Sequence, residues 1–98
     1  MSQCILTITT LPNMEDVLID WLLSYENITG FTSHHAYGHG KNHKMTLAEQ
    51  VTGRRQQVVF NIALEHVFAK EVIDALKQSF SGSGCHYWLN PVLQQGSI

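Results

Sequence analysis

The sequence predicts one α+β domain in which strands and helices follow the order β-α-β-β-α-β. Three observations support this prediction. Four short segments alternate apolar and polar residues, two longer segments carry apolar residues at helical spacing, and no linker or repeat divides the 98 residues. This order is typical of the ferredoxin-like sandwich, which has one antiparallel four-stranded sheet with both helices on one face. We therefore expect residues 1–98 to form a single domain of this class.

The first part of the chain predicts a strand, a helix and a second strand. Residues 3–9 alternate between apolar and polar side chains and are rich in β-branched residues. A helix then runs to about Tyr25, because apolar residues recur at helical spacing. Asn13 is placed to cap this helix, and two acidic residues fall in its first turn, where the helix dipole favours them. After a glycine, residues 31–37 predict the second strand.

The remainder predicts a loop, a strand, a helix and a last strand. Residues 38–53 follow neither period and have glycine at both ends, so we expect a long flexible excursion between the second and third strands. Residues 58–64 alternate cleanly, and residues 67–80 carry apolar side chains on one helical face. Glycines then turn the chain into a final strand over residues 85–89, which ends before Asn90-Pro91.

Composition favours an oligomer and excludes a nucleic-acid or membrane-surface binder. Charged residues make up 14% of the chain, against about 25% in ordinary globular domains. The net charge of −2 provides no basic surface. Because both helices cover one face of the predicted sheet, the other face would expose a largely apolar set: Ile5, Thr7, Val59, Ala63 and Trp88. We expect a second copy of the chain to cover this face in a homo-oligomer.

Cysteine usage and the apolar segments indicate a cytoplasmic protein without direct membrane insertion. No segment has the pattern of a signal peptide, and no apolar stretch is long enough to cross a bilayer. Cys4 and Cys85 are too few for a disulfide framework. They fall on strands that are adjacent in the predicted sheet. They either approach each other, provide soft ligands, or are simply buried apolar side chains.

The number of histidines is unusual, because the chain has six, as many as its lysines and arginines together. Four of them lie within residues 34–43. On an extended strand His35 and His39 share one face, and His43 could fold back from the loop as a third ligand. Neutral imidazoles suit Zn, Cu, Ni or Co. The alternative is a polar strand edge with solvated imidazoles.

No catalytic set is apparent, so we expect a protein that is not an enzyme. The sequence offers neither a Ser/His/Asp order nor paired carboxylates that belong to a cleft. Gly38 and Gly40 would let backbone N–H groups approach a ligand, and Lys41 could meet an anion, although the spacing is not that of a phosphate-binding loop. Arg54 and Arg55 could hold a phosphate or carboxylate, or pair with a surface carboxylate.

Two runs, one at the start of the second predicted strand and one directly after it, carry a resemblance to a known family. Residues 30–32 (GFT) and 38–42 (GHGKN) resemble the signature of PII signal-transduction proteins, where a G-[LFM]-T strand leads into G-x-G-[RK]-[QN] at the start of the long T-loop. More closely, GFTS…GHG, LAEQVTGRR and HYWLNPVL are similar to a small PII-like family of unknown function. Genes of that family commonly accompany heavy-metal efflux systems of the RND type.

The resemblance implies a trimer of ferredoxin-like subunits that binds effectors in clefts between neighbours. It implies that the loop changes shape to regulate a partner, here a membrane efflux protein or another regulatory protein. It also places Thr32 beside an adenine ring. It places Gly38, Gly40, Lys41 and Asn42 beside the phosphates.

Departures from the PII pattern weigh against ATP binding in the usual PII manner. PII proteins read G-D-G-K before the last strand, whereas residues 82–85 read GSGC here, so the lysine that grips phosphate is replaced by Cys85. The C-terminal segment also lacks the PII arginines. Each lost charge-assisted contact costs about 1.5–3 kcal/mol. Cys85 and His86, with the histidines of the second strand at the other edge of the cleft, favour a transition metal or a less charged ligand.

Three functional hypotheses follow. The first is a PII-like regulatory protein that senses a metal or small ligand at His35, His39 and His43, and so orders the loop that contacts its partner. The second is an adenine-nucleotide-binding PII-type transducer in which Lys41, Arg54 or Arg55 replaces the missing charge. The third is a metal-buffering protein for metal tolerance.

Overall fold

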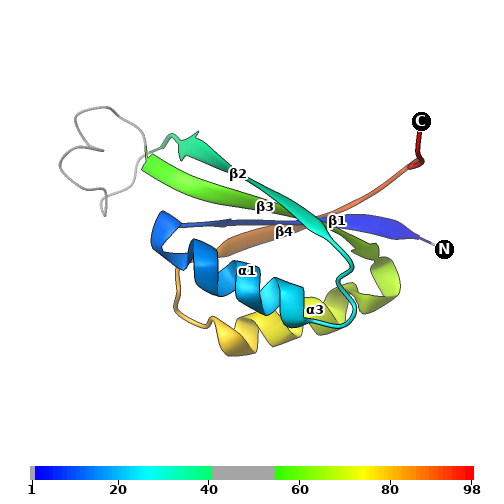
Figure 1. Cartoon of the computed structure of the whole chain (residues 1–98), viewed down its shortest axis with the longest axis horizontal. Helices are drawn as coiled ribbons and strands as arrows, with labels where there is room; N and C mark the ends of the chain where they lie inside the picture. Colours follow the sequence, from blue (N-terminus) through cyan, green and yellow to red (C-terminus); the bar gives the residue numbers. More distant parts are fainter. Residues whose placement is uncertain (1, 41–54) are drawn as a thin grey trace.

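Four strands and two α-helices form the part of the chain that the computed structural model describes, residues 2–40 and 55–98 (Figure 1). The strands are β1 (Gln3–Thr10), β2 (Phe31–Gly38), β3 (Arg55–Glu65) and β4 (His86–Pro91). The helices are α1 (Glu15–Ser24) and α3 (His66–Ser79), with a short 3-10 helix, η1 (Pro12–Met14), before α1. The predicted β-α-β-β-α-β order is confirmed.

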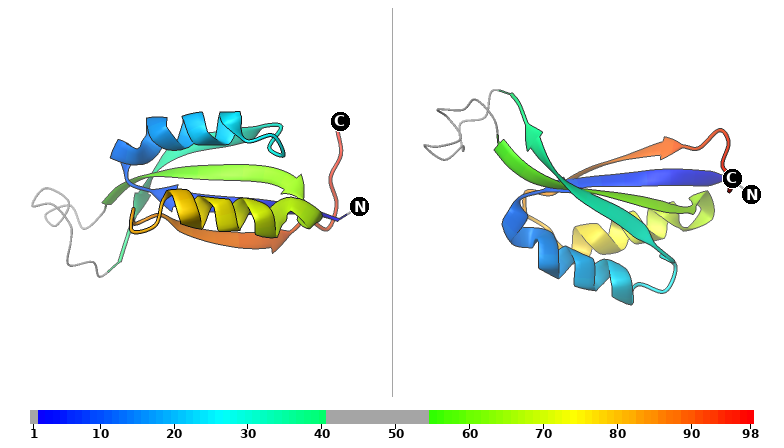
Figure 2. Two further views of the ribbon diagram at one scale, coloured as in Figure 1. Left: turned by 90° about the horizontal axis from the view of Figure 1, so that it is seen from below. Right: turned by 45° about the horizontal axis from the view of Figure 1, so that its top comes forward.

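The sheet has the strand order β2-β3-β1-β4, and every neighbouring pair is antiparallel. Both helices lie on the same face of this sheet, and the other face carries no helix of the described chain (Figures 1 and 2). This arrangement confirms the predicted ferredoxin-like α+β class. We call the two faces of the sheet the helix face and the open face.

The core lies between the helices and the helix face. It is formed by alternate residues of the two central strands and by one stripe of each helix, which matches the periodicities in the sequence, together with Ile28 from the connection between α1 and β2. The completely or almost completely buried members are Cys4, Leu6, Ile8, Leu18, Leu22, Ile28, Val58, Phe60, Ile62, Leu64, Ala69 and Val72. Burying a large aliphatic or aromatic side chain stabilises the folded state by about 1.5–3 kcal/mol, so this cluster is the main source of hydrophobic stabilisation in the fold.

The start of the first helix differs from the prediction. Asn13 lies inside η1, and the residue before α1 is Met14, which makes no side-chain capping hydrogen bond. Glu15 and Asp16 do occupy the first turn of α1, as the sequence indicates. Pro12 explains the difference, because its fixed φ and missing N–H suit the first turn of a helix, and the chain begins to coil there.

The last strand is also displaced from its predicted range. It begins at His86, not Cys85, and it continues through Pro91. A proline is tolerated here because β4 is an edge strand, with β1 as its only neighbour in the described sheet. Proline has no N–H to donate, and strands accept it only where no second neighbouring strand needs that hydrogen bond. Beyond the strand, the Val92 N–H still donates to the Gln3 carbonyl at 3.0 Å.

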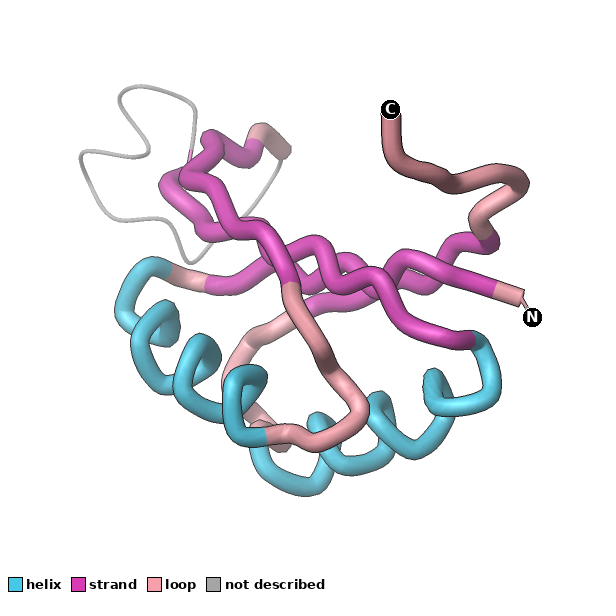
Figure 3. Tube along the Cα trace, turned by 45° about the vertical axis from the view of Figure 1, so that its right-hand side comes forward, coloured by secondary structure: helices cyan, strands magenta, loops and turns pink. Residues whose placement is uncertain are grey.

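The open face carries the residues predicted for it. In the registers of the sheet Ile5 is opposite Ala63, Thr7 is opposite Trp88, and Val59 lies opposite Thr9. Trp88 is 50% exposed. The C-terminal residues also leave the sheet on the side away from the helices (Figures 1 and 3).

The excursion between β2 and β3 was predicted over residues 38–53. Gly38 belongs to β2, so that strand runs one position further than expected. Residues 41–53 lie outside the described residues. In the ranges that are described, no helix is long and apolar enough to cross a membrane.

Candidate functional site

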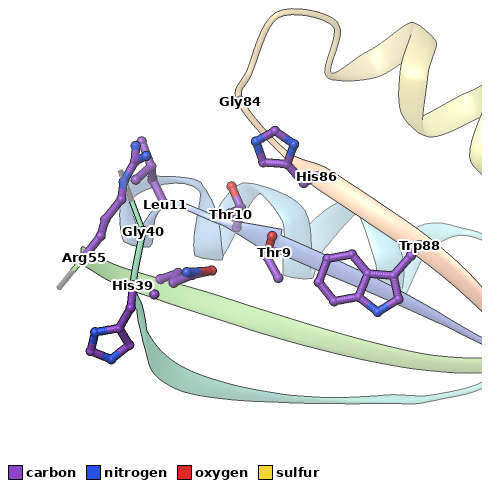
Figure 4. A pocket seen from close by; sticks show the side chains of 11 residues that line it. Thr9, Thr10, Leu11, His39, Gly40, Arg55, Gly84, His86 and Trp88 are labelled. Atoms are coloured by element: carbon purple, nitrogen blue, oxygen red, sulfur yellow. The ribbon is translucent and has the colours of Figure 1, made fainter. Parts of the chain in front are cut away.

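A pocket of about 390 Å³ opens at the edge where β1 and β2 end and where β3 and β4 begin (Figure 4). We call it the strand-end pocket. Antiparallel pairing creates it, because the end of one strand meets the start of the next: Gly38 pairs with Arg55, and Thr9 pairs with His86. Its lining residues are Thr9, Thr10, Leu11, Gly38, His39, Gly40, Arg55, Gln57, Gly84, His86 and Trp88.

Glycines shape two of its edges. A Cβ at Gly38 would collide with the side-chain amide of Gln57, so glycine leaves room for that side chain beside the end of β2. Gly82 and Gly84 have φ values of 77° and 83°, in the left-handed region that other residues adopt at a cost. The turn between α3 and β4 therefore depends on them, and it delivers Gly84 and His86 to the pocket.

The charges in the strand-end pocket suit an anion. Arg55 brings a positively charged guanidinium, which offers five N–H donors. His39 and His86 each bring an imidazole, while the described lining includes no carboxylate. Trp88 adds an exposed indole face, which can stack against a planar ring.

Five of the residues singled out from the sequence line this pocket together. Gly38, Gly40 and Arg55 belong to the predicted effector set, and His39 and His86 belong to the predicted metal set. The His39 and His86 rings nevertheless lie well apart in Figure 4. Within the described ranges no group of three or more His, Cys, Asp or Glu side chains is arranged to hold a metal ion.

Other predicted effector residues lie elsewhere. Thr32 is paired with Asn61 and projects on the open face of β2. It is separated from Gly38 by about 20 Å of strand, so one subunit does not bring it to the strand-end pocket. Lys41, Asn42 and Arg54 lie outside the described residues.

His35 also lies away from the strand-end pocket. It has the same strand parity as Phe31, which packs against the core, and it therefore projects on the helix face. There its Nε2 atom lies 3.1 Å from both carboxylate oxygens of Glu15. The even spacing between Phe31 and His35 in the sequence could have predicted that this imidazole projects on the helix face. The predicted site of His35, His39 and His43 stays a prediction, because His43 lies outside the described residues.

Cys4 lies near the start of β1 and Cys85 lies beside its other end, so the two cysteines do not approach each other. Cys4 pairs with Pro91, is 1% exposed, and points its thiol to the Leu64 carbonyl at 3.5 Å. Burial raises the pKa of this thiol. Cys85 instead donates from Sγ to Thr10 Oγ1 at 3.2 Å. Of the alternatives left by the sequence, a buried apolar side chain therefore describes Cys4.

Cys85 and His86 do not share a site either. Cys85 lines a different pocket, on the helix face, whereas His86 lines the strand-end pocket. Sequence reasoning missed Trp88, Gln57, Thr9 and Thr10 as lining residues. Trp88 could have been found, because it shares strand parity with His86 and was already expected on the open face.

Comparison with solved structures finds this fold in proteins of low sequence identity. A DUF3240 family protein from Shewanella baltica OS155 has a TM-score of 0.80 and 20% identity, over 100% of this chain and 98% of that chain. CPII, a nitrogen regulatory PII-like protein from Thiomonas intermedia K12 bound to ADP, AMP and bicarbonate, has a TM-score of 0.72 and 13% identity, over 100% and 98% of the two chains. The GlnK–ATP complex of B. subtilis has a TM-score of 0.68 and 16% identity, over 93% and 82%.

These likenesses confirm the PII-like fold that the sequence resemblance implied. Comparison with curated proteins finds no match. The profile of one family, described as "Protein of unknown function (DUF3240)", matches residues 1–98. Because that match spans the whole of the sequence, the chain belongs to the DUF3240 family.

Proposed function

We propose that this protein is a non-enzymatic PII-like regulatory protein that binds a small anionic effector in the strand-end pocket. One observation carries the proposal: a guanidinium, two imidazoles and a glycine-edged backbone line this pocket, and the described lining contains no carboxylate to oppose an anion. Hydrogen bonds to charged groups are worth about 1.5–3 kcal/mol each, so Arg55 is the residue expected to contribute most.

An adenine nucleotide with fewer charges than ATP is the effector class that fits best. The exposed indole of Trp88 offers a stacking surface for a base, and Arg55 offers a bidentate partner for one phosphate. This choice is supported by two proteins of the same fold that bind nucleotides, CPII with ADP, AMP and bicarbonate and GlnK with ATP. The replacement of the PII lysine by Cys85 reduces the positive charge available for a triphosphate.

Assembly through the open face is part of this proposal. Ala63 and Trp88 are exposed there, Ile5 and Val59 are only partly buried, and no described helix covers them. A homo-oligomer, a trimer by resemblance to PII proteins, would bury this apolar surface. It would also bring Thr32, which lies on the same face, against a neighbouring copy.

Regulation would pass through the segment between β2 and β3, because both of its ends adjoin the strand-end pocket. Gly40 precedes the segment, Arg55 follows it, and both line the pocket. An effector bound there would favour one conformation of the segment, and a partner protein would read that difference. The partner proposed is a membrane efflux protein or another regulatory protein, in line with the gene context of the family that the sequence resembles.

A transition metal is the second candidate effector, for sensing or for buffering. It is favoured by one observation, the presence of His39 and His86 in the same pocket. Imidazole nitrogen is a good ligand for Zn, Cu, Ni and Co. The two rings would have to move together, and His43 is the further ligand proposed from the sequence.

Calorimetric titration and thermal-shift measurements on the full chain test both candidates. We expect AMP or ADP to raise the melting temperature more than ATP does. We also expect the affinity of Arg55→Ala for AMP or ADP to be at least roughly tenfold lower than that of the unaltered chain. Lys70→Ala, a variant of an exposed cation on α3 away from the pocket, should bind as the unaltered chain does. A shift with Zn, Cu, Ni or Co that disappears in a His39→Ala, His86→Ala variant would instead support the metal. Nucleotide affinity that is unchanged in both Arg55→Ala and Trp88→Ala would contradict the proposed site.

A further inference from the structure

A second pocket, of about 400 Å³, lies on the helix face of the sheet, beneath the last turns of α3. We call it the helix-side pocket. It has no lining residue in common with the strand-end pocket. Its walls are the apolar side chains of Ile8, Leu18, Ile73, Leu76 and Phe80. This volume is in the range of small-molecule sites, roughly 300–1,000 Å³.

The apolar walls are incompletely covered by the fold itself. Ile8 and Leu18 are buried in the core, whereas Ile73, Leu76 and Phe80 are only partly buried. Those three belong to α3 and the residue that follows it, so the unfilled space lies between the end of the helix and β4. An apolar group placed there would gain contacts on several sides and remove the exposed parts of these side chains from water.

Among the described residues that line this pocket, Lys77 is the one with a positively charged side chain. Lys77 Nζ lies 5.4 Å from the centre of the Tyr87 ring, and both residues line the helix-side pocket. Asp74, one turn earlier on α3, forms a salt bridge with Lys70, in which Lys70 Nζ lies 2.7 Å from Asp74 Oδ2. The hydrogen bond from that ammonium is the main cause of the lowered pKa of Asp74. The pocket thus combines a predominantly apolar wall with one positive charge at its rim.

We propose that the helix-side pocket binds a small amphipathic carboxylate, with its apolar chain among Ile73, Leu76 and Phe80 and its carboxylate at Lys77. A medium-chain fatty acid has this chemistry. The site is separate from the strand-end pocket and goes beyond the effector proposed above.

Two features connect the helix-side pocket to the strand-end pocket. Gly82 lines the first and Gly84 lines the second, so one turn borders both. Cys85, which lines the helix-side pocket, donates to Thr10, which lines the strand-end pocket, at 3.2 Å. A ligand that moves the turn would therefore alter both sites.

Decanoate, with decanol as its uncharged analogue, is the probe for calorimetric titration of the full chain. We expect one decanoate to bind per chain, and to bind roughly tenfold more tightly than decanol because of the charge-assisted contact with Lys77. Lys77→Gln should abolish that preference. The double variant Lys70→Gln, Asp74→Asn, which removes a cation on the same helix together with its partner carboxylate, should keep it.

A second measurement needs no variant of the pocket. Decanoate should slow alkylation of Cys85 by iodoacetamide several-fold in the unaltered protein, since this thiol lines the pocket, and Cys4 serves as a buried internal reference. Ser81→Trp, which places a bulky ring at the pocket, should remove both the binding and the protection. Absence of decanoate binding, or binding without protection of Cys85, would overturn the proposal. So would dissociation of an oligomer by Ser81→Trp when the unaltered protein binds no decanoate, because a second copy of the chain would then occupy the pocket.

Discussion

The Nε2 atom of His35 lies 3.1 Å from both carboxylate oxygens of Glu15, and this contact joins β2 to the first turn of α1. The His35 side chain is 68% exposed and that of Glu15 is 26% exposed. Exposed pairs of this kind contribute about 0–1 kcal/mol. The contact therefore fixes the direction in which His35 points more than it stabilises the fold.

The first prediction separates His35 from the strand-end pocket. We expect His35→Ala to lower the free energy of unfolding by less than about 1 kcal/mol, as measured by urea denaturation. It should leave effector or metal affinity at the strand-end pocket unchanged, whereas His86→Ala should weaken it. Equal loss of affinity in the two variants would show that His35 reaches that ligand after all.

The second prediction concerns the turn before β4. Gly84 has a φ of 83°, where an L side chain costs about 1–2 kcal/mol, so Gly84→Ala should destabilise the protein by that amount in urea denaturation. It should also weaken effector binding, because Gly84 lines the strand-end pocket. Gly96→Ala is the matched control, since Gly96 has no positive φ and a Cβ there meets open space. Equal stability of the two variants would contradict the role given to the turn.

Much of the fold follows from local patterns in the sequence, and the exceptions have identifiable causes. The alternation through Val58, Phe60 and Ile62 predicts β3 because those side chains all face one core. The end of β4 was not predicted, because Pro91 is compatible with a strand only at a sheet edge, and the neighbours of a strand are a tertiary property.

The candidate site was predictable only in part. Strand parity placed His35 and His39 on one face, but His39 lies beyond the end of β2, where parity no longer applies. Glu15, which the sequence places only in the first turn of a helix, contacts His35 because that turn of α1 lies beside β2. Gly38 and Arg55 reach one pocket because their strands pair there, and that register depends on the whole sheet.

The third prediction is that the two thiols react at very different rates. Cys4 is 1% exposed and its pKa is raised by burial, so both access and thiolate formation are suppressed. Cys85 is only partly buried. In the native, ligand-free protein, iodoacetamide should therefore modify Cys85 and spare Cys4, as measured by peptide mass spectrometry. Addition of urea should equalise the two rates, and equal rates without urea would contradict the packing of Cys4.

The fourth prediction is a loss of stability at alkaline pH. The Tyr25 hydroxyl donates to Glu71 Oε1 at 3.0 Å. Desolvation, together with this hydrogen bond and the charge of Glu71, raises the pKa of Tyr25 above its ordinary value of 10.0. A group whose pKa is raised by folding contributes stability that is present below the pKa of the unfolded state and is lost as the pH rises through the folded pKa.

Unfolding midpoints measured from about pH 8 to about pH 11 test this prediction. The unaltered protein should lose stability in the upper part of that range, and Tyr25→Phe should lose less, because it has no phenol to ionise. Tyr25→Phe should also be less stable near neutral pH, where the hydrogen bond to Glu71 is intact. Tyr87→Phe controls for the loss of a phenol elsewhere, and an identical pH profile for the two variants would refute the assignment.

The last prediction tests assembly through the open face. Ala63 is exposed on that face opposite Ile5, and a carboxylate there would remain hydrated in a single copy but would be desolvated at an interface. We therefore expect Ala63→Glu to shift the mass measured by light scattering from an oligomer toward the single chain, while its circular dichroism stays unchanged. Val67→Glu, at a position that is 72% exposed on α3, should keep the oligomer, because α3 lies on the opposite side of the sheet. A single-chain mass for the unaltered protein, or dissociation by Val67→Glu alone, would show that the open face is not the interface.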